Sequence, residues 1–258
     1  MTQNDRWAGP LFSAYVKGAR GMLKTAERFK AEILRRLDEV TEGQDEAIHE
    51  AAVIMADTIE RGGIIRAFGS GHSHANALEI CGRAGGYIQT KIVREPALGI
   101  YEMLDGVGDQ FWLKLDVRPE DCLVLISNSG RNPLPVELAL HAREAGIKVI
   151  VVTAREVSAA GTSRSKTGKL LYELGDVVLD NKSCFGDAAL EVEGIPTKVG
   201  GTSLYTGCLL LDCAVMESLD ILLERGVQPP LYMSANVDGG PEFNQKLLDQ
   251  FKDRLAEY

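Results

Sequence analysis

The stretch CLVLISNSGRNPLPVELALHAREAG, at residues 122–146, contains a strand, a polar loop and a helix in direct succession. Its first five residues, 122–126, are all apolar, which is typical of a strand buried on both faces of a parallel sheet. Asn132 suits the N-cap of the helix, Pro133 suits its first position, and Gly146 ends it. The stretch therefore predicts one strand, loop and helix unit of an α/β fold.

A second unit of the same kind lies upstream. An apolar run at residues 64–68 is followed by the loop Gly-Ser-Gly-His-Ser-His at residues 69–74 and by a helical stretch at residues 75–84. Because connections of this kind are right-handed, the two units predict a doubly wound parallel sheet. Further strands are expected at residues 87–93, 149–152 and 177–179.

The rest of the chain is predicted to be mainly helical. The spacing of apolar residues predicts helices at residues 14–37, 45–61, 202–226 and 242–258. The Ser-, Thr- and Gly-rich segment 158–169 predicts a mobile surface loop. We therefore expect a helical arm, a central α/β domain, and a C-terminal extension that packs on this domain or on a partner subunit. Their expected ranges are residues 1–62, 63–226 and 227–258.

The composition excludes several classes of function. The chain has 258 residues, 37 acidic and 28 basic, so it offers no broad basic surface to a nucleic-acid backbone. Its most apolar stretch, residues 204–223, carries three carboxylates, and we expect a core helix there rather than a membrane span. Residues 1–12 show no signal-peptide pattern, and the five cysteines form no CxxC pair. We therefore expect reduced thiols and a cytoplasmic protein.

Two segments match part of a nucleotide-binding motif, but neither matches the whole motif. The loop at residues 69–74 matches the start of the dinucleotide fingerprint, but His74 stands at the third glycine position. The segment 161–169 is similar to a P-loop, but its spacing is wrong, and Leu170 stands where Ser or Thr would hold magnesium. We expect neither NAD nor a nucleoside triphosphate, and no other cofactor.

The loop Ser127-Asn128-Ser129-Gly130 is a candidate anion site. Its two hydroxyl groups, its flexible glycine and its backbone N–H groups lie at a predicted helix N-terminus, where the helix dipole favours an anion. The same composition is also common in turns that only cap a helix. From the loop alone, the two interpretations carry equal weight.

The two loops together resemble the signature of the SIS (sugar isomerase) domain. The resemblance is carried by residues 126–132, Ile-Ser-Asn-Ser-Gly-Arg-Asn, placed downstream of residues 68–73, Phe-Gly-Ser-Gly-His-Ser. Residues 199–203 (Val-Gly-Gly-Thr-Ser) and 234–240 (Ser-Ala-Asn-Val-Asp-Gly-Gly) are similar to an uncharacterised bacterial SIS family described as candidate phosphoheptose isomerases. The paired loops are specific for phosphosugar binding but not for one reaction.

The resemblance implies a five-stranded parallel sheet flanked by helices, as in a flavodoxin-like sandwich. It also implies a homodimer or homotetramer with sites near the subunit boundaries. The serine-rich loop would hold the phosphate of a small sugar phosphate, the first loop and the start of the long helix would complete the pocket, and Arg131 would add charge. The implied substrate-binding residues are Gly71, Ser73, His74, Ser127, Asn128, Ser129, Gly130, Asn132, Thr202 and Ser203.

Interconversion of an aldose and a ketose phosphate needs a base and an acid, roles that suit a carboxylate and a histidine. Glu79 occupies a position where some SIS isomerases place a functional glutamate. Glu95 follows a predicted strand, at the end where parallel strands line a ligand crevice. His72 is expected to open the ring or polarise the carbonyl. Three further acidic residues before the long helix remain alternative bases or solvated side chains: Asp187, Glu191 and Glu193.

One position departs from the phosphoheptose isomerases, because Arg83 falls where they carry a functional glutamate. Their metal-ligand pattern is not reproduced either. His72 and His74 with Glu79 could hold a metal, but the remaining ligands of a metal site are not evident, so no metal is expected.

We therefore predict a phosphosugar-binding SIS protein that acts as an aldose-ketose isomerase by carboxylate and histidine chemistry. Two alternatives remain open. One is a non-catalytic, phosphosugar-sensing regulatory module, and the other is a carbon–oxygen lyase (etherase) that acts on an amino-sugar phosphate. No nucleic-acid or membrane partner is expected.

Overall fold

The computed structural model describes residues 24–97 and 99–255. Its centre is a sheet of five parallel strands in the order β2-β1-β3-β4-β5, which confirms the predicted fold class. The strands are β1 (Ile65–Gly69), β2 (Thr90–Val93), β3 (Cys122–Ile126), β4 (Lys148–Thr153) and β5 (Val177–Asp180).

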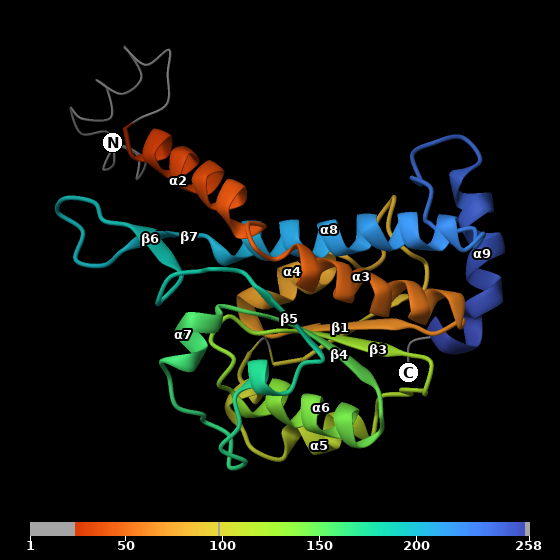
Figure 1. Cartoon of the computed structure of the whole chain (residues 1–258), viewed down its shortest axis with the longest axis horizontal. Coiled ribbons are helices and arrows are strands. Elements are labelled where there is room, and N and C mark those ends of the chain that lie inside the picture. The colour runs from red at the N-terminus through yellow and green to blue at the C-terminus, as the bar shows by residue number, and fades with distance from the viewer. Residues whose placement is uncertain (1–23, 98, 256–258) are drawn as a thin grey trace, which may run out of the picture.

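Helices cover both faces of the sheet (Figure 1). One face packs against α3 (Asp45–Glu60), α4 (His74–Glu79) and α8 (Ser203–Glu224), and the other against α5 (Val107–Trp112) and α6 (Pro133–Glu144). Successive side chains of a strand point to opposite faces, so the apolar run of β3 supplies both cores. Its Val124 belongs to the core under α3 and α8, whereas Leu123 and Leu125 belong to the core over α6.

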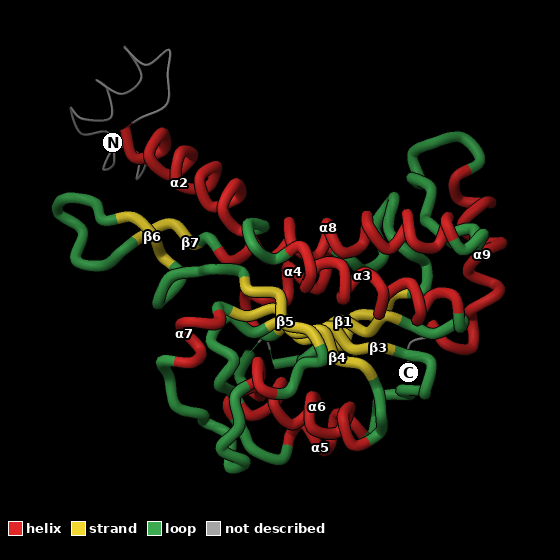
Figure 2. The backbone as a smooth tube through the Cα atoms, in the orientation of Figure 1, coloured by secondary structure: helices red, strands yellow, loops and turns green. Residues whose placement is uncertain are grey.

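An antiparallel hairpin between β5 and α8 has no counterpart in the sequence analysis. It consists of β6 (Ala188–Leu190) and β7 (Val199–Gly201), and Figure 2 shows it extending from the body beside α2 (Lys24–Val40). The other connections contain short helical segments: η2 (Gly71–Ser73), η3 (Tyr101–Met103), α7 (Arg155–Ala159) and η4 (Leu171–Glu173).

The N-terminal helices have different surroundings. α2 ends at Val40 rather than at residue 37, and the first part of its predicted range, residues 14–23, lies outside the described residues. It projects from the body, whereas α3 buries Ala51, Met55 and Ala56 in the core (Figure 1). α3 is therefore an integral layer of the domain, and the boundary at residue 62 stays a prediction.

Two predicted elements are shorter in the structure. The helix expected at residues 75–84 ends at Glu79, and Gly82 and Gly85 follow it with φ of 67° and 81°. These positive values leave the helical region, which explains the early end. The strand expected from residue 87 begins only at Thr90, because Tyr87 forms a single antiparallel bridge to Leu231 of the C-terminal extension.

The C-terminal extension packs on the domain of its own chain. Its last helix is α9 (Gly240–Leu255), and the end of the predicted range, residues 256–258, lies outside the described residues. Arg254 on α9 donates two hydrogen bonds to the carboxylate of Asp121, at 2.6 and 2.8 Å. This side chain fastens the extension to the amino end of β3.

Asp121 is the centre of a buried ionic cluster. Its carboxylate is fully buried, and besides Arg254 it accepts hydrogen bonds from Arg66 Nε at 2.9 Å and from the backbone N–H of Ile64 at 2.8 Å. Arg66 itself is only 1 % exposed. A buried charge is tolerated when it is paired and hydrogen-bonded, so each member of this cluster depends on the others.

Replacement of Asp121 should therefore be costly. We expect Asp121→Asn to lower the free energy of unfolding by about 3–5 kcal/mol, because Arg66 and Arg254 would lose their buried counter-ion. The matched control is Glu39→Gln, which removes an exposed carboxylate paired with Arg35 and should cost less than about 1 kcal/mol. Urea unfolding measures both variants, and equal effects would contradict the assignment of Asp121 as a central buried ion.

Candidate functional site

The hydrogen-bond register of β1 and β3 brings two loops together. Gly69 of β1 pairs with Ile126 of β3, so Ser70 and Ser127 leave the sheet at the same level. The chain places β2 on one side of β1 and β3 on the other, so the strand order reverses here. Ligands of doubly wound sheets bind at the carboxyl ends of the strands at such a reversal.

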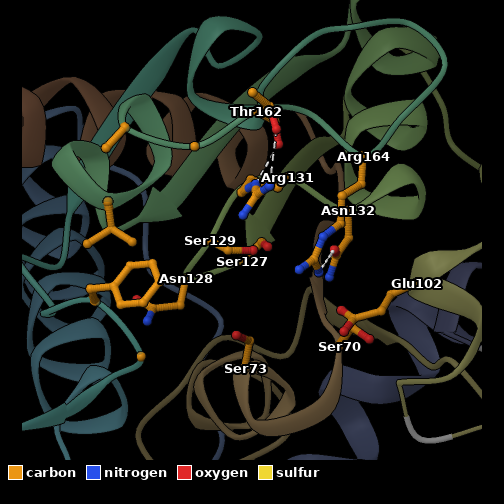
Figure 3. Close-up of a pocket in the computed structure, with 15 residues that line it drawn as sticks. Ser70, Ser73, Glu102, Ser127, Asn128, Ser129, Arg131, Asn132, Thr162 and Arg164 are labelled. Atoms are coloured by element: carbon orange, nitrogen blue, oxygen red, sulfur yellow. Dashed lines mark hydrogen bonds between the residues drawn. The ribbon is translucent and has the colours of Figure 1, made fainter.

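A cavity of about 580 Å³ lies above this point of the sheet. Figure 3 shows polar side chains around a common space, with Ser73 across it from Ser127 and Ser129. The structure thus brings together five residues expected in the site: Ser73, Ser127, Asn128, Ser129 and Asn132. The lining also includes Ser70, Glu102, Arg131, Thr162, Arg164 and Phe185.

The serine loop is a tight turn that requires its glycine. Gly130 donates its backbone N–H to the carbonyl of Ser127 at 3.1 Å, and its φ is 61°. A Cβ at this position would lie 2.6 Å from Ser158 Oγ and 3.1 Å from Thr153 Oγ1. Positive φ and the lack of space both exclude other residues, so Gly130 shapes the site through the backbone.

The loop supplies most of the free backbone donors. The N–H groups of Ser129, Arg131 and Asn132 make no hydrogen bond within the part of the chain that the structure describes. The first and third positions of α6 are Pro133 and Pro135, which carry no N–H. The start of α6 therefore offers few backbone N–H groups to a ligand. The serine loop is the source of the N–H donors at the cavity.

Two arginines give the cavity a cationic wall. Arg131 donates from Nε to the carbonyl of Thr162, and Arg164 donates to Asn132 Oδ1 at 3.0 Å. The backbone N–H of Arg164 also bonds to the carbonyl of Arg131 at 2.9 Å. These contacts fasten the segment 158–169 to the serine loop. The sequence predicted a mobile surface loop there; the structure places part of this segment on the wall of the cavity, and its mobility stays a prediction.

Ser70 is a site residue that the sequence reasoning missed. The residue is only 9 % exposed, and its Oγ has no hydrogen-bond partner among the described residues. A buried polar group without a partner costs free energy unless a ligand or water completes it. Its position directly after β1 was the available signal, because the matching residue after β3 is Ser127.

Glu102 is a second residue that the sequence reasoning missed. It lies in η3, is half-buried, and is the one carboxylate among the described residues that line the cavity. Figure 3 shows it on the same side of the cavity as Ser70 and Arg164. The sequence carried no local signal, because the segment around it has neither strand nor helix periodicity.

The expected catalytic carboxylates lie elsewhere in this chain. Glu79 forms an ion pair with Arg83 and lines a separate cavity of about 410 Å³ between α4 and α8. Glu95 is buried, and its two carboxylate oxygens accept the backbone N–H groups of Ala97 and Gly99. Glu95 therefore holds its own turn together and does not line the main cavity.

The histidines and the acidic residues of the hairpin are also outside the lining of the main cavity. His72 is exposed and His74 is half-buried, and neither lines it. Glu191 pairs with Lys198 across the hairpin at 3.7 Å, and Glu193 is exposed. Among residues 24–97 and 99–255, no group of three His, Cys, Asp or Glu side chains is arranged to bind a metal ion.

Asp187 occupies the N-terminus of α8. Its carboxylate accepts the backbone N–H groups of Thr202 at 3.0 Å and Ser203 at 2.8 Å, and the hydroxyl groups of Ser183 at 2.7 Å and Ser203 at 2.9 Å. Burial acts to raise the pKa of Asp187, but these hydrogen bonds outweigh it and hold the pKa below its ordinary value. Thr202 and Ser203 thus bind a carboxylate of the chain, and neither lines the cavity.

Asn128 connects the serine loop to the segment that contains Asp187. Its Oδ1 accepts a hydrogen bond from Asn181 at 3.0 Å, and its Nδ2 lies 3.5 Å from Ser183 Oγ. Ser183 in turn donates to Asp187 at 2.7 Å. The amide of Asn128 is therefore engaged by the protein, although the residue lines the cavity as expected.

Comparison with known proteins identifies the domain that the two loops resemble. The sequence profile of the SIS domain matches residues 28–154. A UPF0309 protein of Listeria monocytogenes is 51% identical over 218 residues, which cover 84% of this chain and 93% of that protein. A UPF0309 protein of Streptomyces coelicolor is 35% identical, with 90% of this chain and 97% of that protein covered.

Solved structures share the fold at low sequence identity. A proposed phosphosugar isomerase of capsule formation from Bacteroides fragilis has a TM-score of 0.53 and 20% identity, with 79% of this chain and 92% of that chain covered. The phosphoheptose isomerase of Neisseria gonorrhoeae has a TM-score of 0.50 and 18% identity, with 76% and 97% covered. In the described part of the chain, no helix combines the length and apolar character that a membrane crossing requires.

The hydrogen bonds to Asp187 predict a pH-dependent stability. Its folded pKa is lower than the ordinary value of 3.8, so its contribution is complete above that pH and is lost as the pH falls through the folded pKa. We expect Asp187→Asn to cost about 1–3 kcal/mol at neutral pH. Urea unfolding should show this difference shrinking as the pH falls below 3.8.

The control for this prediction is Asp238→Asn, which changes an exposed aspartate in the C-terminal extension. Its free energy of unfolding should match that of the unmodified protein at each pH. A cost of Asp187→Asn that stayed constant down to the acid limit would show that the carboxylate charge is not the source of the stability.

Proposed function

The chain belongs to the UPF0309 family of SIS-domain proteins, and we propose that it binds a sugar phosphate in the cavity above β1 and β3. One observation carries the proposal: unpaired donors and cationic side chains converge on that cavity. The buried Ser70 hydroxyl and the N–H groups of Ser129, Arg131 and Asn132 have no acceptor in the described chain. A phosphate group supplies several strong acceptor oxygens for such donors.

The size of the cavity suits such a ligand. Small-molecule sites usually enclose about 300–1,000 Å³, and this cavity has about 580 Å³. Arg131 and Arg164 compensate locally for the net charge of −9, which would otherwise repel an anion. The neutral donors and the two guanidinium groups together support the proposed binding of a phosphate dianion.

The finer proposal is aldose-ketose isomerisation with Glu102 as the base. The carboxylate would remove a proton from the hydroxyl-bearing carbon beside the carbonyl, and the electrons of that C–H bond would form an enediolate with its charge on the former carbonyl oxygen. The hydroxyl proton would move to that oxygen, and return of the abstracted proton to the former carbonyl carbon would complete the isomerisation without any oxidant or reductant. We favour Glu102 over Glu79 and Glu95 because it lines the same cavity as the proposed phosphate site.

A second candidate function is a phosphosugar sensor without catalysis. The observation that favours it is the sparse supply of acid and base groups in the cavity. Among the described lining residues there is a single carboxylate, Glu102, and no histidine. Such a site binds a sugar phosphate but lacks a second group to open the sugar ring, unless another subunit supplies it.

Heavy-water exchange distinguishes the two functions. The experiment incubates the protein with fructose 6-phosphate, sedoheptulose 7-phosphate and glucosamine 6-phosphate in deuterium oxide, and follows carbon-bound deuterium by NMR. An isomerase should incorporate deuterium, and Glu102→Gln should slow this by about 10²–10⁴-fold, the usual contribution of a general base. The matched control, Glu144→Gln, changes a carboxylate whose side chain is 78% exposed and should leave the rate unchanged.

Other results would change or contradict the proposed function. Saturable binding without exchange for every sugar phosphate in the panel would favour the sensor. A loss of exchange with Glu79→Gln but not with Glu102→Gln would return the base to the residue expected from the sequence. Calorimetry that detects no binding of inorganic phosphate or of any sugar phosphate would contradict both functions.

We also propose that the chain assembles into a homodimer or homotetramer. α2 projects from the body, and exposed apolar side chains lie along it and along α8, with Leu34 52% exposed and Leu223 57% exposed. Surfaces of this kind are stabilised by contact with another subunit. Static light scattering at micromolar concentration should give twice or four times the mass of 28.0 kDa, and a monomer would contradict the proposal.

A further inference from the structure

Phe185 is an exposed aromatic residue on the wall of the cavity. The residue is 85% exposed, and its ring is the one aromatic ring among the described lining residues. It also lines a neighbouring cavity of about 380 Å³, bordered by Arg36 and Lys182. Exposed apolar side chains are common singly, so exposure alone carries no function. The backbone that presents this ring gives the stronger argument.

The turn around Phe185 holds an unfavourable backbone. Lys182 and Asp187 are the two non-glycine residues with positive φ in the described chain, at 48° and 64°, and they flank the ring on both sides. Such conformations persist only when the surrounding structure enforces them. Here Lys182 Nζ donates to the carbonyls of Glu39 at 2.7 Å and Glu42 at 2.8 Å, and the Asp187 carboxylate holds the other side.

The same turn is attached to the serine loop. Asn181, at its start, donates to Asn128 Oδ1 at 3.0 Å, and Ser183 lies 3.5 Å from Asn128 Nδ2. The position of the Phe185 backbone is therefore fixed relative to the donors proposed to bind phosphate. A ligand anchored by its phosphate would meet the aromatic ring with its carbon skeleton.

We propose that Phe185 selects the sugar part of the ligand by stacking on its C–H face. This inference rests on the proposed function, since it requires a phosphosugar in the cavity. Sugars present an apolar face of C–H groups, and an aromatic ring that lies against it removes apolar surface from water. Inorganic phosphate has no such face. The serine loop thus binds the anion, and Phe185 discriminates sugar phosphates from the bare anion.

The test compares two ligands on the same variants. Calorimetry measures the affinity for inorganic phosphate and for the tightest-binding member of the panel of fructose 6-phosphate, sedoheptulose 7-phosphate and glucosamine 6-phosphate. Phe185→Ala should lower the affinity for the sugar phosphate by about two- to tenfold and leave the affinity for inorganic phosphate unchanged. Phe185→Trp, which keeps an aromatic face, should restore the preference for the sugar phosphate.

The control is Phe243→Ala. Phe243 is also exposed, at 42%, but it lies on α9, at the opposite end of the molecule from the hairpin (Figure 1). This variant should bind both ligands like the unmodified protein. A comparable loss of sugar-phosphate affinity in Phe243→Ala would show that the effect does not come from the cavity.

Three results would overturn the inference, and each is distinct from a failure of the proposed function. The first is an equal loss of affinity for both ligands in Phe185→Ala, and the second is no loss for the sugar phosphate. The third is a change in molar mass of Phe185→Ala by light scattering, which would place the ring in a subunit contact. Failure of the proposed function would instead appear in the unmodified protein, as no binding of either ligand.

Discussion

The site depends on the hydrogen-bond register between β1 and β3. Because these strands are parallel and Gly69 pairs with Ile126, the loops that follow them begin at the same edge and level of the sheet. A slip of one residue would turn every side chain of one strand to the other face and exchange its partners in the two cores. The side chains of β3 pack into both cores, and the fit of their shapes against their neighbours holds the register on which the site depends.

The two ends of β1 and β3 carry different arrangements of polar groups. At the amino end, the buried carboxylate of Asp121 accepts hydrogen bonds from two guanidinium groups and from the backbone N–H groups of Ile64 and Arg118. At the carboxyl end, the Ser70 hydroxyl is buried without a partner, and two arginines border open space. The ion pairs at the amino end join the C-terminal helix to the sheet, and a ligand is expected at the carboxyl end.

The sequence predicted the fold well because its signals are local. Apolar runs with flanking Gly and Ser residues gave the strands of the sheet, and the serine loop was correctly placed after β3. The site was predicted only in part, because its remaining walls come from segments without periodicity. Glu102 and Arg164 reach the cavity through loops whose paths depend on long-range hydrogen bonds, such as that from Arg164 to Asn132. Thr202 and Ser203 were expected to meet the ligand, but Asp187, fifteen residues upstream of Thr202, takes their donors.

The two prolines at the start of α6 affect how a ligand would be oriented in the cavity. Helix N-termini generally attract anions, but Pro133 and Pro135 remove donors from this one, and Asp187 already fills the start of α8. At the cavity, the groups proposed to attract negative charge are therefore the serine loop, the Ser70 hydroxyl and the two arginines. A sugar phosphate bound as proposed would place its phosphate group at this region and direct its sugar away from it.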